Sequence, residues 1–473
     1  MTLSLRKTAV LRAIPALGLA LFAASASPVA VAQPPANPDS LAALVRIIAD
    51  DVARVLESPS GRAGRFGRSA TESQRNAWDH QVDEWVSKLR AIDGDQLYGR
   101  PEWVLHGVLQ EGLESNIGVR VCRDSATANR TACYHAQLRS YTTLPLTGDE
   151  VTAKAMTLRQ SLDDELRPLV QRILGTTDVN DARRQFRSEP RFMAGTREEL
   201  TRLTEQALLR AKARMPAFFR EVPDDTLVVI PEPAATEATM GAPARYMSAT
   251  ADRPASLVLN LYRPEERPAM GAYVAAVHEG YPGHHHQIVL GDRVGAQHPS
   301  LAYFQMAGFI EGWGLYSERL ADEMGIYPSD LERAWYLAHL SDATLGMLID
   351  PAINTGSWTR AQAVDSMVIV SGRPRWEAEN YANRHLATPG QIVTYAVGYA
   401  EIMRLRDKAR RRLGNRFDIK AFHHALLQHG EITLPMLRYS VERWIQEAPT
   451  SRVRPSLHSQ DLPAPINGSS GKR

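Results

Sequence analysis

The sequence has almost no net charge, which limits the partners that it can bind. Its 473 residues include 55 Lys and Arg against 53 Asp and Glu, a formal charge of +2. Residues 1–32 hold three of the basic residues and no acidic one, so removing these three from the total of +2 leaves −1. A near-neutral chain gives no electrostatic footprint for nucleic acid or an anionic membrane, and we expect neither as a partner.

Long apolar runs are also scarce. The apolar stretch Ala13–Ala24 is too short to span a bilayer, and no later segment is long and apolar enough to do so. A basic start precedes this stretch, and Ala30-Val31-Ala32 follows it as a cleavage site of the A-x-A type. These parts predict a secretory signal peptide over residues 1–32 and an exported protein, periplasmic or secreted, without later membrane insertion. The alternative interpretation is an uncleaved membrane anchor.

Cysteine is limited to two residues, Cys122 and Cys133. In an exported protein an even number of cysteines favours a disulfide. The bond would close a short polar loop, so we expect closure to contribute about 2–3 kcal/mol at most. The alternative is a pair of buried free thiols.

Helical periodicity dominates the rest of the sequence. Apolar residues between 41 and 56 recur with the spacing of one helix face, and segments 71–93, 150–174 and 197–218 also have helical patterns. Gly175 directly follows the segment 150–174 and is a typical helix stop.

The pattern changes between residues 227 and 262. The runs there are short, rich in β-forming residues and bounded by Pro, Gly and Asp, which predicts a small sheet. Beyond this region the chain is again helical to about residue 446. Thr388-Pro389 predicts a cap followed by a helix that begins at Pro389 and ends at Gly414.

The composition, 44% hydrophobic and 23% charged, is that of a globular chain rather than a disordered or fibrous one. No internal repeat or sharp change in composition divides it. We expect a single mainly α-helical domain over residues 33–449. Residues 450–473 are rich in Pro, Ser and Gly, and we expect them to be a disordered tail.

One segment, residues 277–287, has the composition of a metal site: VHEGYPGHHHQ. It begins like the H-E-x-x-H zinc helix, in which two His one turn apart bind the metal and the Glu activates water. The position four residues after His278 is Pro282, so the simple motif fails. The alternative is a surface His-rich turn. The apolar residues on both sides of the segment instead favour a core helix, in which three buried imidazoles must each have a polar or metal partner.

Helix geometry indicates how this segment can still hold an ion. On an unbroken helix His285 shares a face with His278 but lies ~10.5 Å along the axis, too far for both to bind one ion through bonds of ~2.0–2.1 Å. Proline cannot continue a regular helix, so we expect Pro282-Gly283 to bulge out as two extra residues. We therefore predict His278 and His284 as ligands and Glu279 as general base. His285 is the competing ligand, or otherwise a residue that supports the ligands.

A third ligand is expected from a later helix. Glu311 and Glu318 are seven residues apart and so face the same side of a helix. Apolar residues before Glu311 indicate that it is buried, and a buried carboxylate must be paired, protonated or metal-bound. We predict Glu311 as the third ligand and Glu318 as an acid close behind the ligands. A plain salt bridge from Glu318 to Arg319 or Arg333 is the alternative.

These motifs together resemble those of the DUF885 family, a domain of unknown function. The resemblance rests on Asn260-Leu261, the histidine segment, the run EGWGLYSE at 311–318, Pro389-Gly390-Gln391 and YAVGY at 395–399. It covers about residues 40 to 447. The family is similar to helical gluzincin metallopeptidases, such as thimet-like oligopeptidases and Taq-type carboxypeptidases. The resemblance therefore implies a helical, clamshell-like body with a deep channel and a small β-sheet beside a zinc site.

The resemblance also assigns further residues. It supports the three metal ligands and the general base, and it implies that Tyr395 or Tyr399 donates to the developing oxyanion. These tyrosines lie one helical turn apart, and aromatic packing in the core is the alternative for each. Asn260 ends an apolar run, where it could align an extended peptide along a strand edge. A strand-end turn is the alternative for Asn260.

The sequence departs from the family pattern at three positions. Gly346 stands where relatives usually have Arg, and Asn354 stands where they have His. His385 replaces a Tyr after Arg384. If the family Arg or His binds substrate, this chain should differ in specificity or rate.

We expect an exported zinc-dependent peptidase with one Zn²⁺ per chain and a peptide substrate. One alternative is a non-catalytic peptide- or metal-binding protein on the same scaffold, which the changes at Gly346 and Asn354 motivate. Another is a zinc hydrolase of a different amide or ester bond. The sequence leaves open the length of the substrate, the physiological metal and the oligomeric state.

Overall fold

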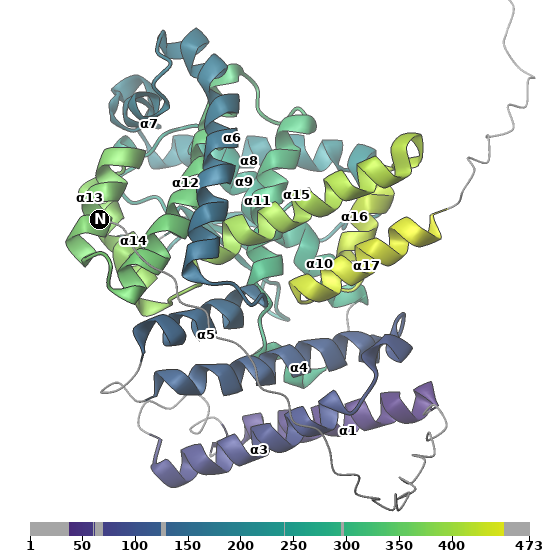
Figure 1. The fold of residues 1–473 in the computed structure, drawn as a ribbon. Coiled ribbons are helices and arrows are strands. Elements are labelled where there is room, and N and C mark those ends of the chain that lie inside the picture. The colour runs from purple at the N-terminus through teal and green to yellow at the C-terminus, as the bar shows by residue number, and fades with distance from the viewer. Residues whose placement is uncertain are drawn as a thin grey trace, which may run out of the picture.

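A computed structural model describes residues 37–448 except for 60, 62–69, 124–128, 241 and 295–297. The expected signal peptide and the expected tail lie outside the described residues. Within them, the prediction of a mainly α-helical fold with one small sheet is confirmed (Figure 1). No helix in the described part of the chain meets the length and hydropathy of a membrane span.

The helices fall in two groups along the chain, before and after the sheet. The first group is α1 (Pro38–Glu57), α3 (Glu72–Arg90), α4 (Pro101–Gly118), α5 (Arg130–Thr142), α6 (Gly148–Leu174), α7 (Val179–Ser188) and α8 (Arg197–Phe218). The second is α9 (Gly271–Glu279), α10 (His284–Val294), α11 (Ala307–Glu323), α12 (Asp330–Thr355), α13 (Arg360–Ser371), α14 (Arg375–Ala387), α15 (Val393–Leu413), α16 (Ile419–Leu427) and α17 (Leu434–Glu447). Short 3-10 helices are η1 (Gly94–Leu97), η2 (Val119–Cys122), η3 (Pro190–Phe192), η4 (Pro264–Glu266), η5 (Pro299–Tyr303) and η6 (Gly414–Arg416).

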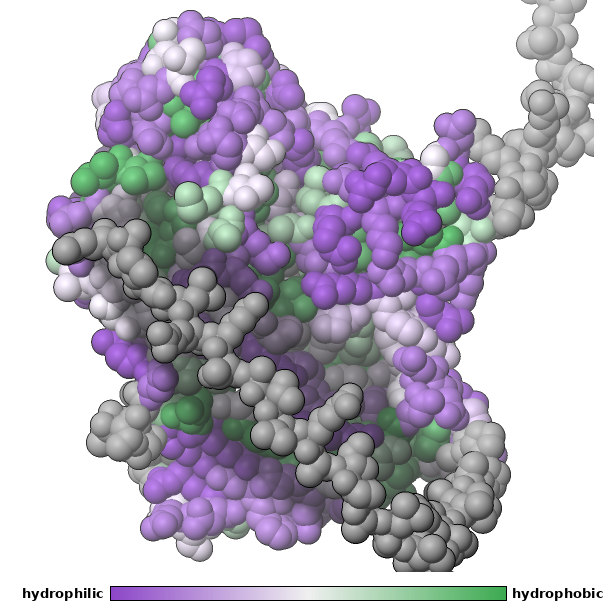
Figure 2. Space-filling view, viewed as in Figure 1, coloured by the Kyte–Doolittle hydropathy of each residue, from purple (hydrophilic) through white to green (hydrophobic). Residues whose placement is uncertain are grey.

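Helices α1, α3 and α4 form a layer at one end of the molecule, with α5 between this layer and the larger body (Figure 1). Apolar faces pack inward, and hydrophilic side chains dominate the face of the body shown in Figure 2, above all over α6 and α17. A disulfide between Cys122 at the end of η2 and Cys133 in α5 joins two successive helical segments. One continuous hydrophobic cluster runs from Leu41 on α1 to Val441 on α17. The clamshell-like shape and its deep channel stay predictions.

The sheet has three strands in the order β1-β3-β2. They are β1 (Leu227–Pro231), β2 (Ala244–Met247) and β3 (Ala255–Leu259), with β1 parallel and β2 antiparallel to β3. Every residue of the central strand β3 is buried. Since both β2 and β3 contact α9, the sheet lies directly beside the helix that carries the histidine motif.

Helices α11 and α15 cross in backbone contact, which brings their side chains into one site. A Cβ atom on Gly312 would lie 2.5 Å from the Cα of Gly398, and one on Gly398 would lie 1.9 Å from the carbonyl oxygen of Gly308. Glycine is therefore required at this crossing. The close approach sets Glu311 of α11 beside Tyr395 of α15, as the electrostatic effect of Glu311 on Tyr395 also indicates.

The structure confirms most helix ends and corrects one. Gly175 ends α6 in the left-handed conformation at φ 73°, and Gly414 ends α15. The predicted start at Pro389 is wrong, because α15 begins at Val393. Gly390 has φ +88° and donates its N–H to the carboxylate of Asp350 at 2.7 Å, so this stretch forms a turn instead of a first helical turn.

Candidate metal centre

The histidine motif lies on two helices separated by a tight turn. Helix α9 ends at Glu279 and α10 begins at His284, so Gly280–Gly283 interrupt the helical path. A Cβ atom on Gly283 would lie 1.9 Å from the carbonyl oxygen of His278, and only glycine allows such an approach. The predicted two-residue bulge in one continuous helix is therefore wrong in detail. The turn nevertheless returns His284 to the vicinity of His278, with their rings 4.8 Å apart.

Three side chains converge at this turn. His278, His284 and Glu311 each offer one ligand atom, and these atoms lie within 4.8 Å of one another. Glu311 Oε2 is 3.7 Å from His278 Nε2 and 3.5 Å from His284 Nε2. Ligand atoms around a tetrahedral zinc ion with bonds of ~2.0–2.2 Å lie roughly 3.3–3.6 Å apart. The two separations from Glu311 are close to this range, and two imidazoles with one carboxylate form a set of side chains that can hold a metal ion.

Neighbouring acceptors orient both imidazoles toward the same point. His278 Nδ1 donates to Glu318 Oε1 at 2.8 Å, and His284 Nδ1 donates to Gln287 Oε1 at 3.3 Å. Because these oxygens can only accept, each Nδ1 carries the proton and each Nε2 keeps its lone pair free for a metal. Glu318 is fully buried, and His339 Nε2 lies 3.5 Å from the same carboxylate oxygen.

The salt-bridge alternative for Glu318 does not occur in the structure. Arg319 instead binds Glu165, and Arg333 binds Asp322. Glu318 is thus directed at the back of the His278 ring. A carboxylate in this place fixes the tautomer and raises the basicity of a ligating histidine.

The electrostatics of the cluster favour a positive charge at its centre. Burial alone would lower the pKa of His278, but the carboxylates of Glu311 and Glu318 hold it well above its usual value. Burial alone would raise the pKa of Glu311, but His278 and His284 hold it well below its usual value. A divalent cation can supply this charge in place of protons.

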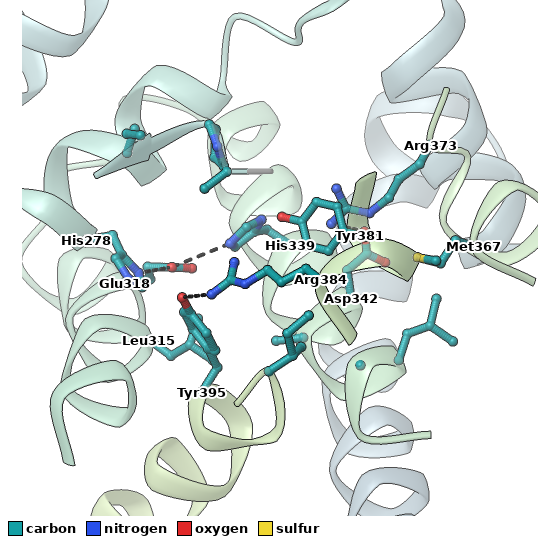
Figure 3. Close-up of a pocket in the computed structure, with 18 of the residues that line it drawn as sticks. His278, Leu315, Glu318, His339, Asp342, Met367, Arg373, Tyr381, Arg384 and Tyr395 are labelled. Carbon is teal, nitrogen blue, oxygen red and sulfur yellow. Dashed lines mark hydrogen bonds and ion pairs between the residues drawn. The ribbon is translucent and has the colours of Figure 1, made fainter. Parts of the chain in front are cut away.

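A cavity opens beside the cluster (Figure 3). Figure 3 shows His278, Glu318 and Tyr395 together at one end of it. Glu279 directly follows His278, is 8% exposed and also belongs to the cavity lining. We call the end that holds His278 the metal end of the cavity.

Tyr395 is the predicted tyrosine that reaches the cavity. Its ring stacks on the ring of His278 with centroids 6.0 Å apart, and its hydroxyl accepts from Arg384 Nη2 at 3.0 Å. Since that hydroxyl accepts here, its own proton stays free for another acceptor. Burial and the neighbouring Glu311 raise the pKa of Tyr395, so the proton is kept at neutral pH.

Two other predicted residues lie away from the cavity. Tyr399 is 4% exposed, and its electrostatic neighbours include Arg319 and Arg406 rather than the metal ligands. Asn260 is 1% exposed, donates to the carbonyl oxygens of Met240 and Ala242, and accepts from a backbone N–H. Asn260 thus stabilises the turn after β3, as the alternative interpretation of this residue proposed.

His285 points away from the cluster. It is fully buried, and its Nδ1 lies 3.2 Å from the hydroxyl of Tyr246 on β2. Burial lowers the pKa of His285 to about 4, so the ring is neutral at physiological pH. Of the two competing ligands, His284 is the one that the structure brings to His278 and Glu311.

The three departures from the family pattern occupy one region at the cavity, where Gly346 and His385 belong to the lining. Asn354 donates to the carbonyl oxygens of Asp350 and His385, and His385 Nδ1 lies 2.6 Å from Asp350 Oδ1. Gly346 lines the cavity itself, where a Cβ atom would lie 2.7 Å from Ile392. Glycine at 346 therefore leaves room for Ile392 in the cavity wall.

Sequence reasoning missed several polar residues of the cavity, among them His339 and Arg384. They lie on α12 and α14, and neither belongs to a short motif with the ligands. Helix α12 packs against α9 and α15, and α14 packs against α12, so tertiary packing brings both residues to the site.

These features define a helical protein with a candidate metal centre, and comparison with known proteins gives its family. A family model described as a bacterial protein of unknown function, DUF885, matches residues 119–441. The chain therefore belongs to the DUF885 family. No match to a curated protein was found.

Two solved structures share the fold. One is a protein from Colwellia psychrerythraea described as a putative lipoprotein, with a TM-score of 0.64, 23% identity, and coverage of 85% of this chain and 70% of that one. The other is described as a putative lipoprotein of unknown function from Shewanella oneidensis, with a TM-score of 0.57, 18% identity, and coverage of 83% and 81%. At these identities the likeness concerns the fold alone.

Proposed function

We propose that the protein is a zinc-dependent peptidase with one Zn²⁺ per chain, held by His278, His284 and Glu311. One observation carries the proposal. Three ligand atoms lie within 4.8 Å of one another, and Glu279 borders the adjoining cavity directly after the first ligand. This is the arrangement that metal-assisted hydrolysis needs: an open-sided metal site, a base and a space for the substrate.

Each residue has a defined task in this proposal. A bound zinc ion would polarise the scissile carbonyl and lower the pKa of its water toward ~7. Glu279 takes a proton from that water and passes it to the leaving amine. Tyr395 donates its free hydroxyl proton to the developing oxyanion, and Arg384 fixes the orientation of that hydroxyl.

Replacement of the base tests the mechanism. In Glu279→Gln the metal ligands are unchanged, so the variant should keep about one zinc per chain and lose peptide hydrolysis by about 100-fold to 10,000-fold, the range for general-base catalysis. Elemental mass spectrometry of untagged protein measures the first, and a quenched-fluorescence peptide library measures the second. Turnover by the variant at the parent rate would reject Glu279 as base.

The same library separates the alternatives. Peptides bound but never cut by the zinc-loaded parent would favour a non-catalytic binding protein. Turnover of a small amide or ester without turnover of any peptide would favour another hydrolase.

We also propose that the protein is exported to the periplasm or secreted. The support is the signal-peptide pattern, the disulfide between Cys122 and Cys133, and the description of both fold neighbours as putative lipoproteins. The chain has no cysteine near residue 32 for lipid attachment. Expression of the full sequence should yield an extracytoplasmic product whose N-terminus is Gln33, which cell fractionation and N-terminal sequencing can check.

A further inference from the structure

The cavity beside the metal centre contains two arginines that differ in how their charge is balanced. Arg373 forms ion pairs with Glu377 and Asp342. Arg384 has no carboxylate within ion-pair distance in the described ranges, and its hydrogen bonds go to the neutral Gln391 and Tyr395. A guanidinium stays charged at every physiological pH, and a partly buried charge needs a counter-charge. Arg384 is therefore a cation whose natural partner is an anion that enters the cavity.

The position of Arg384 limits what that anion can be. Figure 3 places its guanidinium between Tyr395 and His339, facing the metal end. Tyr395 alone bridges the gap to the ligands, since its hydroxyl binds Arg384 and its ring stacks on His278. An anion bound to Arg384 is thus separated from His278 by the side chain of Tyr395. In a peptide, the residue just after the scissile bond is the nearest one that can carry such a carboxylate, since consecutive residues are spaced by ~3.8 Å.

The lining of the cavity also includes the apolar residues Leu345, Ile349 and Met367. Figure 3 places Met367 on the side of Arg384 away from His278, together with Asp342 and Arg373. The carboxylate of Asp342 is engaged by Arg187 at 2.8 Å, and by further arginines. An apolar side chain can therefore occupy this side of the cavity while its own α-carboxylate meets Arg384.

We infer that Arg384 binds the free C-terminal carboxylate of the substrate, so that the protein removes single C-terminal residues with apolar side chains. The inference rests on the proposed peptidase function and deepens it to a carboxypeptidase. In the reaction, water adds across the last peptide bond: its oxygen and one proton go to the carbonyl carbon, and its other proton goes to the amine of the released amino acid. A guanidinium is suited to this carboxylate because its planar donors match both oxygens.

A binding measurement tests the assignment without relying on turnover. The probes are the tripeptide N-acetyl-Ala-Ala-Leu as the free acid and as the C-terminal amide, titrated by calorimetry into zinc-loaded Glu279→Gln. The acid should bind about 10-fold to 100-fold more tightly than the amide, the range for hydrogen bonds to charged groups. Equal affinity for the two peptides would overturn the assignment.

Variants of Arg384 in the same background locate the effect. Arg384→Met should reduce the ratio of acid to amide affinity to about one, whereas Arg384→Lys keeps the charge and should retain part of it. Arg375→Met is the matched control, because Arg375 lies on the same helix, is exposed and pairs with Asp365. A full preference for the acid in Arg384→Met would assign the carboxylate to another group and reject the inference.

Hydrolysis by the parent chain is scored separately. Acid peptide that is bound preferentially but never cut would reject the peptidase function and leave the carboxylate site standing. Cleavage of peptides blocked at both ends, with equal binding of acid and amide, would keep the peptidase function and reject the carboxylate site.

Discussion

Two buried clusters of charged side chains border the same cavity and differ in how their charges are satisfied. In one, Asp342 pairs with Arg187 at 2.8 Å and with Arg183 at 3.7 Å. In the other, His278, His284 and Glu311 direct three ligand atoms at one point. The arginine cluster balances its charges within the protein, so its role is in stability. The metal cluster pairs one carboxylate with two imidazoles, and under the proposed function a metal ion takes the place of the protons that hold this charge.

This difference shows that burial of charge alone does not identify a site. Both clusters have shifted pKa values, and those of Asp342 and Glu311 are both lowered by their partners despite burial. What distinguishes the metal cluster is the convergence of three possible ligand atoms and the neighbouring carboxylate of Glu279. The predictions below test this distinction, beginning with the largest effect.

The neighbouring residues His284 and His285 give the sharpest test of which side chains bind the metal. His284→Ala removes one of three ligands and should reduce the zinc content from about one per chain to near zero after dialysis. His285→Ala is the matched control and should retain its zinc, because His285 faces Tyr246 on the sheet. Elemental mass spectrometry of the untagged variants measures their zinc content. Loss of zinc in the His285 variant and retention in the His284 variant would reverse the ligand assignment.

A substitution in the arginine cluster should change the stability of the protein rather than its metal content. Asp342→Asn leaves buried arginines, Arg187 above all, without their counter-charge and should lower the free energy of unfolding by about 3–5 kcal/mol. Zinc content should stay at about one per chain under native conditions. Urea denaturation of the zinc-free protein measures the stability without a contribution from the metal.

An exposed pair of the same type controls for the change of residue. Asp365 binds Arg375 at 2.8 Å, and both side chains are more than half exposed. Asp365→Asn should therefore change the free energy of unfolding by less than about 1 kcal/mol. Equal effects of the two substitutions would show that the arginine cluster is not a buried network in solution.

The pH dependence of stability should also differ between these variants. Burial would raise the pKa of Asp342, but Arg187, Arg373 and Arg183 lower it below its usual value. The stabilisation by this carboxylate is thus present at neutral pH and is lost as the pH falls through the lowered pKa. Asp342→Asn should lack this contribution to the acid dependence, whereas Asp365→Asn should retain it.

The convergence of His278, His284 and Glu311 could be predicted from the sequence because the deciding physics is local. Pro282 cannot continue the helix of His278, and the residues after it restart a helix in which His284 comes first. Glu311 followed from the apolar residues before it. Local reasoning left two alternatives open for both Tyr399 and Asn260, because their surroundings depend on which distant helices and loops pack against them.

The second half of the cavity could not be predicted for the same reason. Arg384 lies on α14, His339 and Asp342 lie on α12, and no spacing in the sequence links them to the histidines. Both Arg373 and Arg384 line the cavity. Only the positions of carboxylates such as Glu377 determine that Arg373 forms ion pairs and that Arg384, within the described part of the chain, does not. Such differences in charge balance depend on tertiary packing alone.

The smallest predicted effect is on zinc affinity, and it concerns Glu318, the buried carboxylate that binds the proposed ligand His278. Glu318 is fully buried like Asp342, yet its partner is the back of the ligand His278 at 2.8 Å. Glu318→Gln keeps an acceptor but loses the charge, so zinc affinity should fall by about 10-fold to 100-fold, as for other partners of ligating histidines. Competition with a chelator measures it. Glu165→Gln is the control, since Glu165 binds the neighbouring Arg319 at the surface and should leave zinc affinity unchanged. Equal zinc affinity in the parent and in Glu318→Gln would place Glu318 with Asp342 as a structural charge, and the two clusters would then differ only in their three ligand atoms.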